Sequence, residues 1–133
     1  INSMFGVMYL SGHIVYADEK NFNLIADGVE LYKKNRDFIK EAYPIYPCGT
    51  INMEKQGFFC YGLKTDKKIM LAVWRINSAN STEMFDLSSY TGEKASAKVI
   101  YPEKLQTRYH FAGGRLTVEL KEQMSARLFE ITL

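Results

Sequence analysis

The periodicity of the apolar residues changes once along this 133-residue chain, at the sequence PIYPCG of residues 44–49. Before it, apolar side chains of residues 18–42 recur every three or four positions, as in an α-helix that buries one face. After it, short apolar segments alternate with turn residues, which is typical of strands. Proline disfavours helical dihedral angles in the residue before it, so the helix must end by Tyr43. The chain therefore combines one long helix with a sheet structure.

The helix predicted over residues 18–42 has an unusually wide apolar stripe. Asp18 is a suitable N-cap, and the charges of Asp18 and Glu19 suit the N-terminal end of a helix. Two neighbouring rows of apolar side chains follow. The rows are Phe22, Ile25, Val29, Tyr32 and Ile39, and beside them Leu24, Leu31 and Phe38. A stripe of this width indicates that the helix buries much of its girth against a neighbouring structure.

The remainder of the chain predicts a mainly β fold, an antiparallel β-sandwich preceded by the one long N-terminal α-helix. Residues 68–76 are apolar on both faces, which indicates a central strand covered on both sides. Gly113 and Gly114 suit a tight two-residue turn. Strands are expected at residues 58–63, 68–76, 83–87, 97–101, 107–112, 115–120 and 125–133.

Charge and cysteine content exclude several classes of partner. The net charge of +2 is too small to favour nucleic acid or a membrane, so neither is expected as a partner. We interpret the pairs Lys33–Lys34 and Lys67–Lys68 as solvated surface charges. Cys48 and Cys60 fit neither a metal-ligand spacing nor a disulfide framework, which predicts buried free thiols in a reducing, cytoplasmic compartment.

The residues predict no catalytic, cofactor-binding or metal-ligating site and no cofactor. Ser11–Gly12–His13 lacks the first glycine of a nucleophile elbow, and we interpret Ser11–Gly12 as a turn. The carboxylate pairs of the helix have the spacing of ordinary surface charges. These pairs are Asp27 with Glu30, and Asp37 with Glu41.

The aromatic residues leave two interpretations open. Trp74 lies among apolar strand residues, which favours a place in the core or at a domain interface over a sugar-stacking platform. Tyrosine is common in strands, yet four tyrosines are also candidates for lining a groove. They are Tyr61, Tyr90, Tyr101 and Tyr109.

Four segments and a closing one, in this order, resemble the C-terminal end of bacterial alpha-galactosidases of glycoside hydrolase family 36. They are YLSGHI of residues 9–14, YKKNRD of 32–37, PIYPCG of 44–49, LAVWR of 71–75 and ARLF of 126–129. Cys48 stands where this family more usually has leucine. The resemblance spans nearly the whole chain.

The resemblance implies two parts. Residues 1–43 would be the end of a (β/α)8 barrel including its last helix, and residues 44–133 a C-terminal antiparallel β-sandwich domain. Residues 44–49 would be the hinge, and the apolar stripe would lie against barrel strands outside this sequence. The expected partner is therefore the catalytic barrel of the same parent chain. The first residue is not Met, which fits a piece of a longer protein.

The catalytic residues of the family have no counterpart here. Retaining hydrolysis of alpha-linked galactose needs two carboxylates about 5 Å apart. The resemblance places them in Leu-Lys-Trp-Asp and Arg-x-x-Asp motifs of the barrel. Leu63–Lys64–Thr65–Asp66 nearly matches the first, but Thr65 replaces the tryptophan and Asp66 is expected in a hairpin turn. No Arg-x-x-Asp occurs. The chain is thus expected to be non-catalytic, with the alpha-galactoside bound by the parent enzyme. Ser11–Gly12–His13 is the one segment that could approach the parent's substrate pocket, but we do not assign it that role.

Two alternatives remain beside this hypothesis. A carbohydrate-binding β-sandwich module would need several aromatic rings on one exposed face. A stand-alone interaction domain would use the helix to bind a partner, and a homo-oligomer is a further open outcome.

Overall fold

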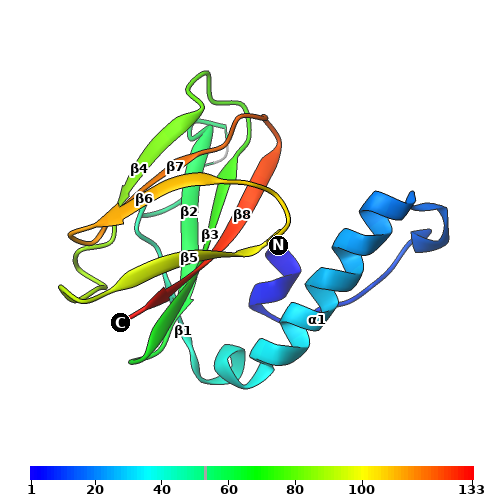
Figure 1. Cartoon of the computed structure of the whole chain (residues 1–133), viewed down its shortest axis with the longest axis horizontal. Coiled ribbons are helices and arrows are strands. Elements are labelled where there is room, and N and C mark those ends of the chain that lie inside the picture. The colour runs from blue at the N-terminus through cyan, green and yellow to red at the C-terminus, as the bar shows by residue number, and fades with distance from the viewer. Residues whose placement is uncertain (53) are drawn as a thin grey trace.

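The computed structural model describes residues 1–52 and 54–133 and has three layers (Figure 1). A five-stranded sheet, in the order β1-β2-β3-β8-β5, lies between a three-stranded sheet, β4-β7-β6, and a helical layer. All strand pairs are antiparallel, which confirms the predicted fold class. The elements are η1 (Asn2–Phe5), η2 (Ile14–Tyr16), α1 (Glu19–Glu41), β1 (Tyr43–Ile45), β2 (Phe58–Lys64), β3 (Lys68–Arg75), β4 (Thr82–Asp86), β5 (Ser96–Tyr101), β6 (Arg108–Ala112), β7 (Arg115–Glu119) and β8 (Ser125–Thr132).

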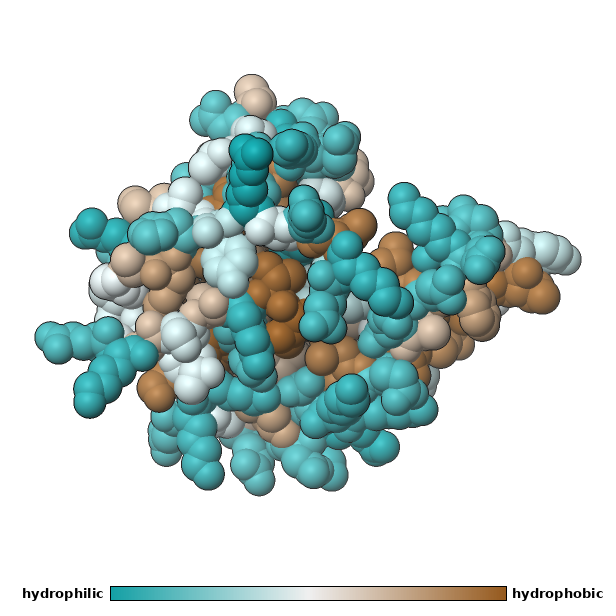
Figure 2. All heavy atoms as spheres, in the orientation of Figure 1, coloured by the Kyte–Doolittle hydropathy of each residue, from teal (hydrophilic) through white to brown (hydrophobic). Residues whose placement is uncertain are grey.

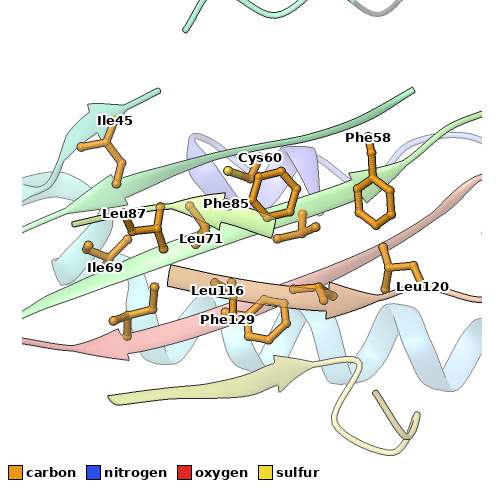
Figure 3. Close-up of a cluster of buried hydrophobic side chains, with 13 residues drawn as sticks. Ile45, Phe58, Cys60, Ile69, Leu71, Phe85, Leu87, Leu116, Leu120 and Phe129 are labelled. Carbon is orange, nitrogen blue, oxygen red and sulfur yellow. The ribbon is translucent and has the colours of Figure 1, made fainter. Parts of the chain in front are cut away.

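Strand β3 is the centre of the fold, as its two apolar faces predicted. It pairs with β2 on one side and β8 on the other, and every residue after Lys68 is buried. Alternate side chains enter two separate cores. Ile69, Leu71 and Val73 point into the core between the two sheets (Figure 3). Met70, Ala72 and Trp74 point into the core beneath the helical layer.

The helix begins and ends where the sequence predicted. Asp18 is the N-cap, and one of its carboxylate oxygens accepts a hydrogen bond of 2.8 Å from the backbone N–H of Asn21. At the other end, the N–H of Ala42 donates to the carbonyl of Phe38 before the chain turns extended. Local capping and the following proline therefore fix both ends of α1.

One row of α1 packs on the outer face of the five-stranded sheet, so the expectation that the stripe faces only a barrel needs correction. Leu31 and Phe38 join the outer core. Nearer the start of the helix, Gly28 lets the Met4 side chain approach the helix backbone closely. A Cβ at residue 28 would lie 2.8 Å from Cε of Met4. Tyr101 of β5 donates from Oη to the carbonyl of Leu24 at 2.9 Å. This chain therefore covers the second row of the stripe with its own strands.

A polar cluster joins α1 to the sheet and corrects the interpretation of Lys68 as a solvated charge. Lys67 is exposed, but Nζ of Lys68 donates to Oδ1 of buried Asn35 and to a carboxylate oxygen of Glu130, both at 2.9 Å. The same nitrogen lies 4.8 Å from the ring centroid of Phe38, within reach of a cation–π interaction. Because Lys68 is the first residue of β3, its side chain reaches the helix packed above.

Glu130 is the shared anion of this cluster. Burial raises its pKa, but hydrogen bonds from Lys68 and Lys98, together with their positive charges, hold the pKa below the ordinary value. The carboxylate thus stays charged in the folded state at neutral pH. Its contribution to stability is present above the ordinary pKa and is lost as the pH falls through the lowered one.

The predicted hinge begins inside the sheet. Tyr43, Pro44 and Ile45 form β1 and pair with Lys64, Leu63 and Gly62 of β2. Proline is tolerated because β1 is an edge strand, where one side of the backbone needs no ladder partner. The chain therefore joins the sandwich directly after α1. The domain boundary between residues 43 and 44 stays a prediction.

Candidate interaction surface

The first six residues anchor the N-terminal segment to the body of the molecule. Met4 of η1 is 3% exposed and lies against Gly28 in the outer core. The ring of Phe5 lies 5.2 Å from that of Tyr61. Tyr32 of α1 donates from Oη to the carbonyl of Gly6 at 3.0 Å. Residues 1–6 thus fill the space between α1 and the sheet.

Beyond this anchor, the segment that leads into α1 carries many exposed apolar side chains. It runs out to the far end of α1, away from the sandwich (Figure 1), and apolar atoms are visible at this projecting end (Figure 2). Half of the large apolar side chains that the described residues expose lie here. We call them the N-terminal apolar surface: Val7 (68% exposed), Tyr9 (80%), Leu10 (56%), Val15 (83%), Tyr16 (79%) and Phe22 (52%).

Ser11–Gly12–His13, in which the sequence predicted a turn, lies within this surface. All three residues are exposed. Gly12 has a φ of +86°, and its carbonyl accepts from the N–H of Ile14 at 3.0 Å, so the chain bends here as predicted. The His13 ring lies 5.4 Å from that of Tyr16.

The structure gives Asp66 no catalytic surroundings. It is exposed in the turn between β2 and β3, where the N–H of Thr65 donates to the carbonyl of Lys68 at 2.9 Å. The four helix carboxylates examined in the sequence are exposed as well. Across residues 1–52 and 54–133, no group of three or more His, Cys, Asp or Glu side chains is placed to hold a metal ion.

Trp74 is a core residue, as its sequence context predicted. It is 9% exposed and stacks on Tyr61 and Phe59, with ring centroids 4.8 and 5.4 Å away. The four candidate tyrosines do not line one groove. Tyr61 and Tyr101 lie on the helical side of the five-stranded sheet, whereas Tyr90 and Tyr109 pack elsewhere, Tyr109 against Phe129.

A polar groove of about 360 Å³ lies at one end of β7 and β8 and was not predicted. Both arginines of its lining are engaged: Arg127 donates to Oγ1 of Thr107 at 2.7 Å, and Arg108 pairs with Glu119 at 3.6 Å. Burial lowers the pKa of Arg127. No local pattern predicts this groove, because its lining comes from separate segments. It is Leu105, Gln106, Arg108, Glu119, Lys121, Glu122, Ser125 and Arg127.

Comparison of the chain with models of protein families, with curated proteins and with solved structures finds no match in any of the three. Among the described residues, α1 and the shorter helices include none that is long and apolar enough to cross a membrane. The resemblance to alpha-galactosidases therefore stays a prediction.

Proposed function

We propose that this chain is the non-catalytic C-terminal domain of an alpha-galactosidase, docked through its N-terminal apolar surface on the catalytic barrel of the same parent chain. The parent enzyme would hydrolyse terminal alpha-linked galactose with retention, using two barrel carboxylates. The observation that carries the proposal is the exposure of six large apolar side chains between residues 7 and 22.

The six side chains of this surface belong to neither hydrophobic core of the molecule. The five-stranded sheet packs against apolar side chains on both faces. Singly exposed apolar residues such as Met84 need no explanation, but large exposed patches on soluble proteins mark interaction sites. Burying each such side chain against a partner stabilises by about 1.5–3 kcal/mol. In the proposed arrangement, the parent chain runs from the barrel directly into residues 1–18. The end of the barrel would therefore lie next to this surface and offer it an apolar partner.

The cytoplasm is the compartment that fits this proposal. Cys48 and Cys60 are both free thiols. Thiols persist in reducing compartments, whereas secreted proteins of this size commonly use cysteines for disulfides. The domain would then support the barrel by packing rather than by covalent cross-links.

Removing the exposed apolar side chains should turn an associating chain into a monomer. Without a barrel, we expect the chain to self-associate through the N-terminal apolar surface. The triple substitution Leu10→Ser, Tyr16→Ser and Phe22→Ser should abolish this association. It should change the free energy of unfolding by no more than about 0.5 kcal/mol per site, as exposed substitutions do. Sedimentation velocity over a range of concentrations measures the first effect, and thermal melting the second.

The matched control replaces exposed methionines elsewhere. Met84 and Met124 are 52% and 79% exposed and lie outside the surface. Met84→Ser with Met124→Ser should leave association unchanged. A wild-type chain that stays monomeric at every concentration would contradict the docking role of this surface.

A further inference from the structure

Cys48 and Cys60 lie side by side although the sequence shows no motif that joins them. Their sulfurs are 3.6 Å apart, and both residues are free thiols. Cys60 lies on β2 and is fully buried in the core between the sheets (Figure 3). Cys48 lies in the connection after β1 and is half-buried. The pair therefore joins a half-buried cysteine to a fully buried one.

The edge of β2 explains why Cys48 comes to this position. Strand β1 ends at Ile45, which is paired with Gly62. Cys60 precedes Gly62 by two residues in β2 and therefore lies beyond the end of β1. Its N–H donates to Sγ of Cys48 at 3.3 Å. Cys48 thus replaces the strand partner that this N–H would otherwise lack. This sulfur also lies 3.6 Å from the Cys60 sulfur, close enough for a thiol hydrogen bond between them.

The contacts with Cys60 favour the negative charge of the pair on Sγ of Cys48. The S–H of Cys60 and, less strongly, its N–H lower the pKa of Cys48 to about 7, against burial and the Glu83 carboxylate, which raise it. Cys60 shows the opposite shift: its pKa is raised because its S–H is donated to Cys48 and because it is buried. A thiolate that is accessible to solvent and beside a neutral thiol is the arrangement of redox-sensitive cysteines.

We propose that Cys48 and Cys60 form a reversible disulfide when the chain meets a peroxide. The Cys48 thiolate attacks one peroxide oxygen, the O–O bond breaks, and hydroxide leaves, so that Cys48 becomes a sulfenic acid. The Cys60 sulfur then attacks the sulfenic sulfur. Its proton and the displaced hydroxide leave as water. Two electrons pass from the two sulfurs to the peroxide, and a dithiol reverses the step by exchange.

The fold allows the closure with a small movement on one side only. A disulfide needs the sulfurs to move from 3.6 Å to about 2.0 Å apart. Cys60 is held in β2 by its pairing with Val73 of β3, whereas Cys48 lies in a turn closed by a hydrogen bond from the N–H of Gly49 to the carbonyl of Tyr46. A hollow of about 440 Å³, lined by Tyr46, Gly49, Thr50 and Ile51, opens beside this turn.

The disulfide would clamp the connection between β1 and β2 to the sheet. Residues 48–60 would become a closed ring, which restricts the unfolded chain, so the oxidised form should melt at a higher temperature than the reduced form. This inference is independent of the proposed docking on a barrel.

The test uses the full chain with hydrogen peroxide. Oxidation should lower the intact mass by two hydrogen atoms. Trypsin cleavage after Lys55 separates the cysteines, so peptides 41–55 and 56–64 should stay linked until dithiothreitol is added. The oxidation rate should rise with pH with a midpoint of about 7, the pKa of Cys48. Cys48→Ser should leave Cys60 as a thiol under the same conditions.

Cys60→Ala removes the second sulfur and keeps an apolar side chain in the core. In this variant, Cys48 should accumulate as a sulfenic acid that dimedone captures. Two results would overturn the proposal: both cysteines of the wild type remain thiols under peroxide, or the linked peptides arise only between two chains. Both results are measured on the wild-type chain, so the test remains valid even if a variant fails to fold.

Discussion

Replacing Trp74 with alanine is expected to lower the free energy of unfolding by about 3–5 kcal/mol, the cost of removing a large aromatic side chain from a core. Trp74 is 9% exposed on the central strand and stacks on Tyr61 and Phe59. The same substitution would remove the packing surface beneath η1, where Met4 joins this cluster. Chemical denaturation followed by circular dichroism measures the loss.

Two controls define what this result means. Met84→Ala removes an exposed apolar side chain from a strand and should change stability by no more than about 0.5 kcal/mol. Trp74→Phe keeps an aromatic ring in the core and should lose less than Trp74→Ala. An unchanged melting temperature with altered galactose binding in Trp74→Ala would instead favour a carbohydrate-binding module.

Replacing Arg75 with methionine should cost about 2–4 kcal/mol. One hydrogen bond to a charged group contributes about 1.5–3 kcal/mol, and only the bond to Leu120 is fully buried, so solvent can partly replace the others. Arg75 is 6% exposed, and its guanidinium joins two loops by donating to backbone carbonyls. Nη1 donates to Leu120 at 2.7 Å and to Lys121 at 2.5 Å, while Nε and Nη2 donate to Ser78 at 3.2 and 2.9 Å. Methionine would leave the Leu120 and Lys121 carbonyls without their guanidinium donor, and Ser78 would keep only the 3.3 Å hydrogen bond from Nε2 of Gln123.

Arg75→Lys separates charge from geometry. Lysine keeps the positive charge but lacks the planar fork that serves both loops at once, so it should recover only part of the lost stability. Faster amide exchange near residues 78–81 and 119–122 should accompany the loss. A variant Arg75→Met as stable as the wild type would show that solvent replaces these hydrogen bonds without cost.

The helix and most strands follow from local sequence. Asp18 and Pro44 bracket α1, and alternation with turn residues places the strands from β2 to β8 within two residues of their observed bounds. Gly113 and Gly114 both have positive φ, as a tight two-residue turn requires. Periodicity and chain breakers act over a few residues, so a single sequence reveals them.

The features that the sequence did not reveal depend on how distant segments meet. Lys68 looks like surface charge until Asn35 of α1 lies over it. Cys48 and Cys60 become neighbours only because β1 stops short along β2. The resemblance implied a hinge at residues 44–49, yet Pro44 lies in β1, an edge strand that accepts proline. Strand order and the packing of the layers determine the surroundings of Lys68, the cysteine pair and Pro44. Local sequence patterns predict neither.

The candidate surface was predicted only in part. The wide stripe of α1 predicted an unpartnered apolar face and included Phe22, which is exposed. The row of Leu31 and Phe38, however, packs on the chain's own sheet. The most exposed side chains come from residues 7–16, which have neither helical nor strand periodicity and therefore gave no signal. Periodicity identifies an apolar face but not the structure that covers it.

The proposed function is tested most directly by an assay of aryl alpha-galactoside hydrolysis on two proteins. One is the product of the complete reading frame that contains this chain, and the other is the chain itself. The complete product is predicted to hydrolyse the substrate with retention of configuration, because its barrel would supply both carboxylates, and the chain alone is predicted to show no turnover. A complete product without activity, or turnover by the chain alone that Asp66→Ala abolishes, would contradict the assignment.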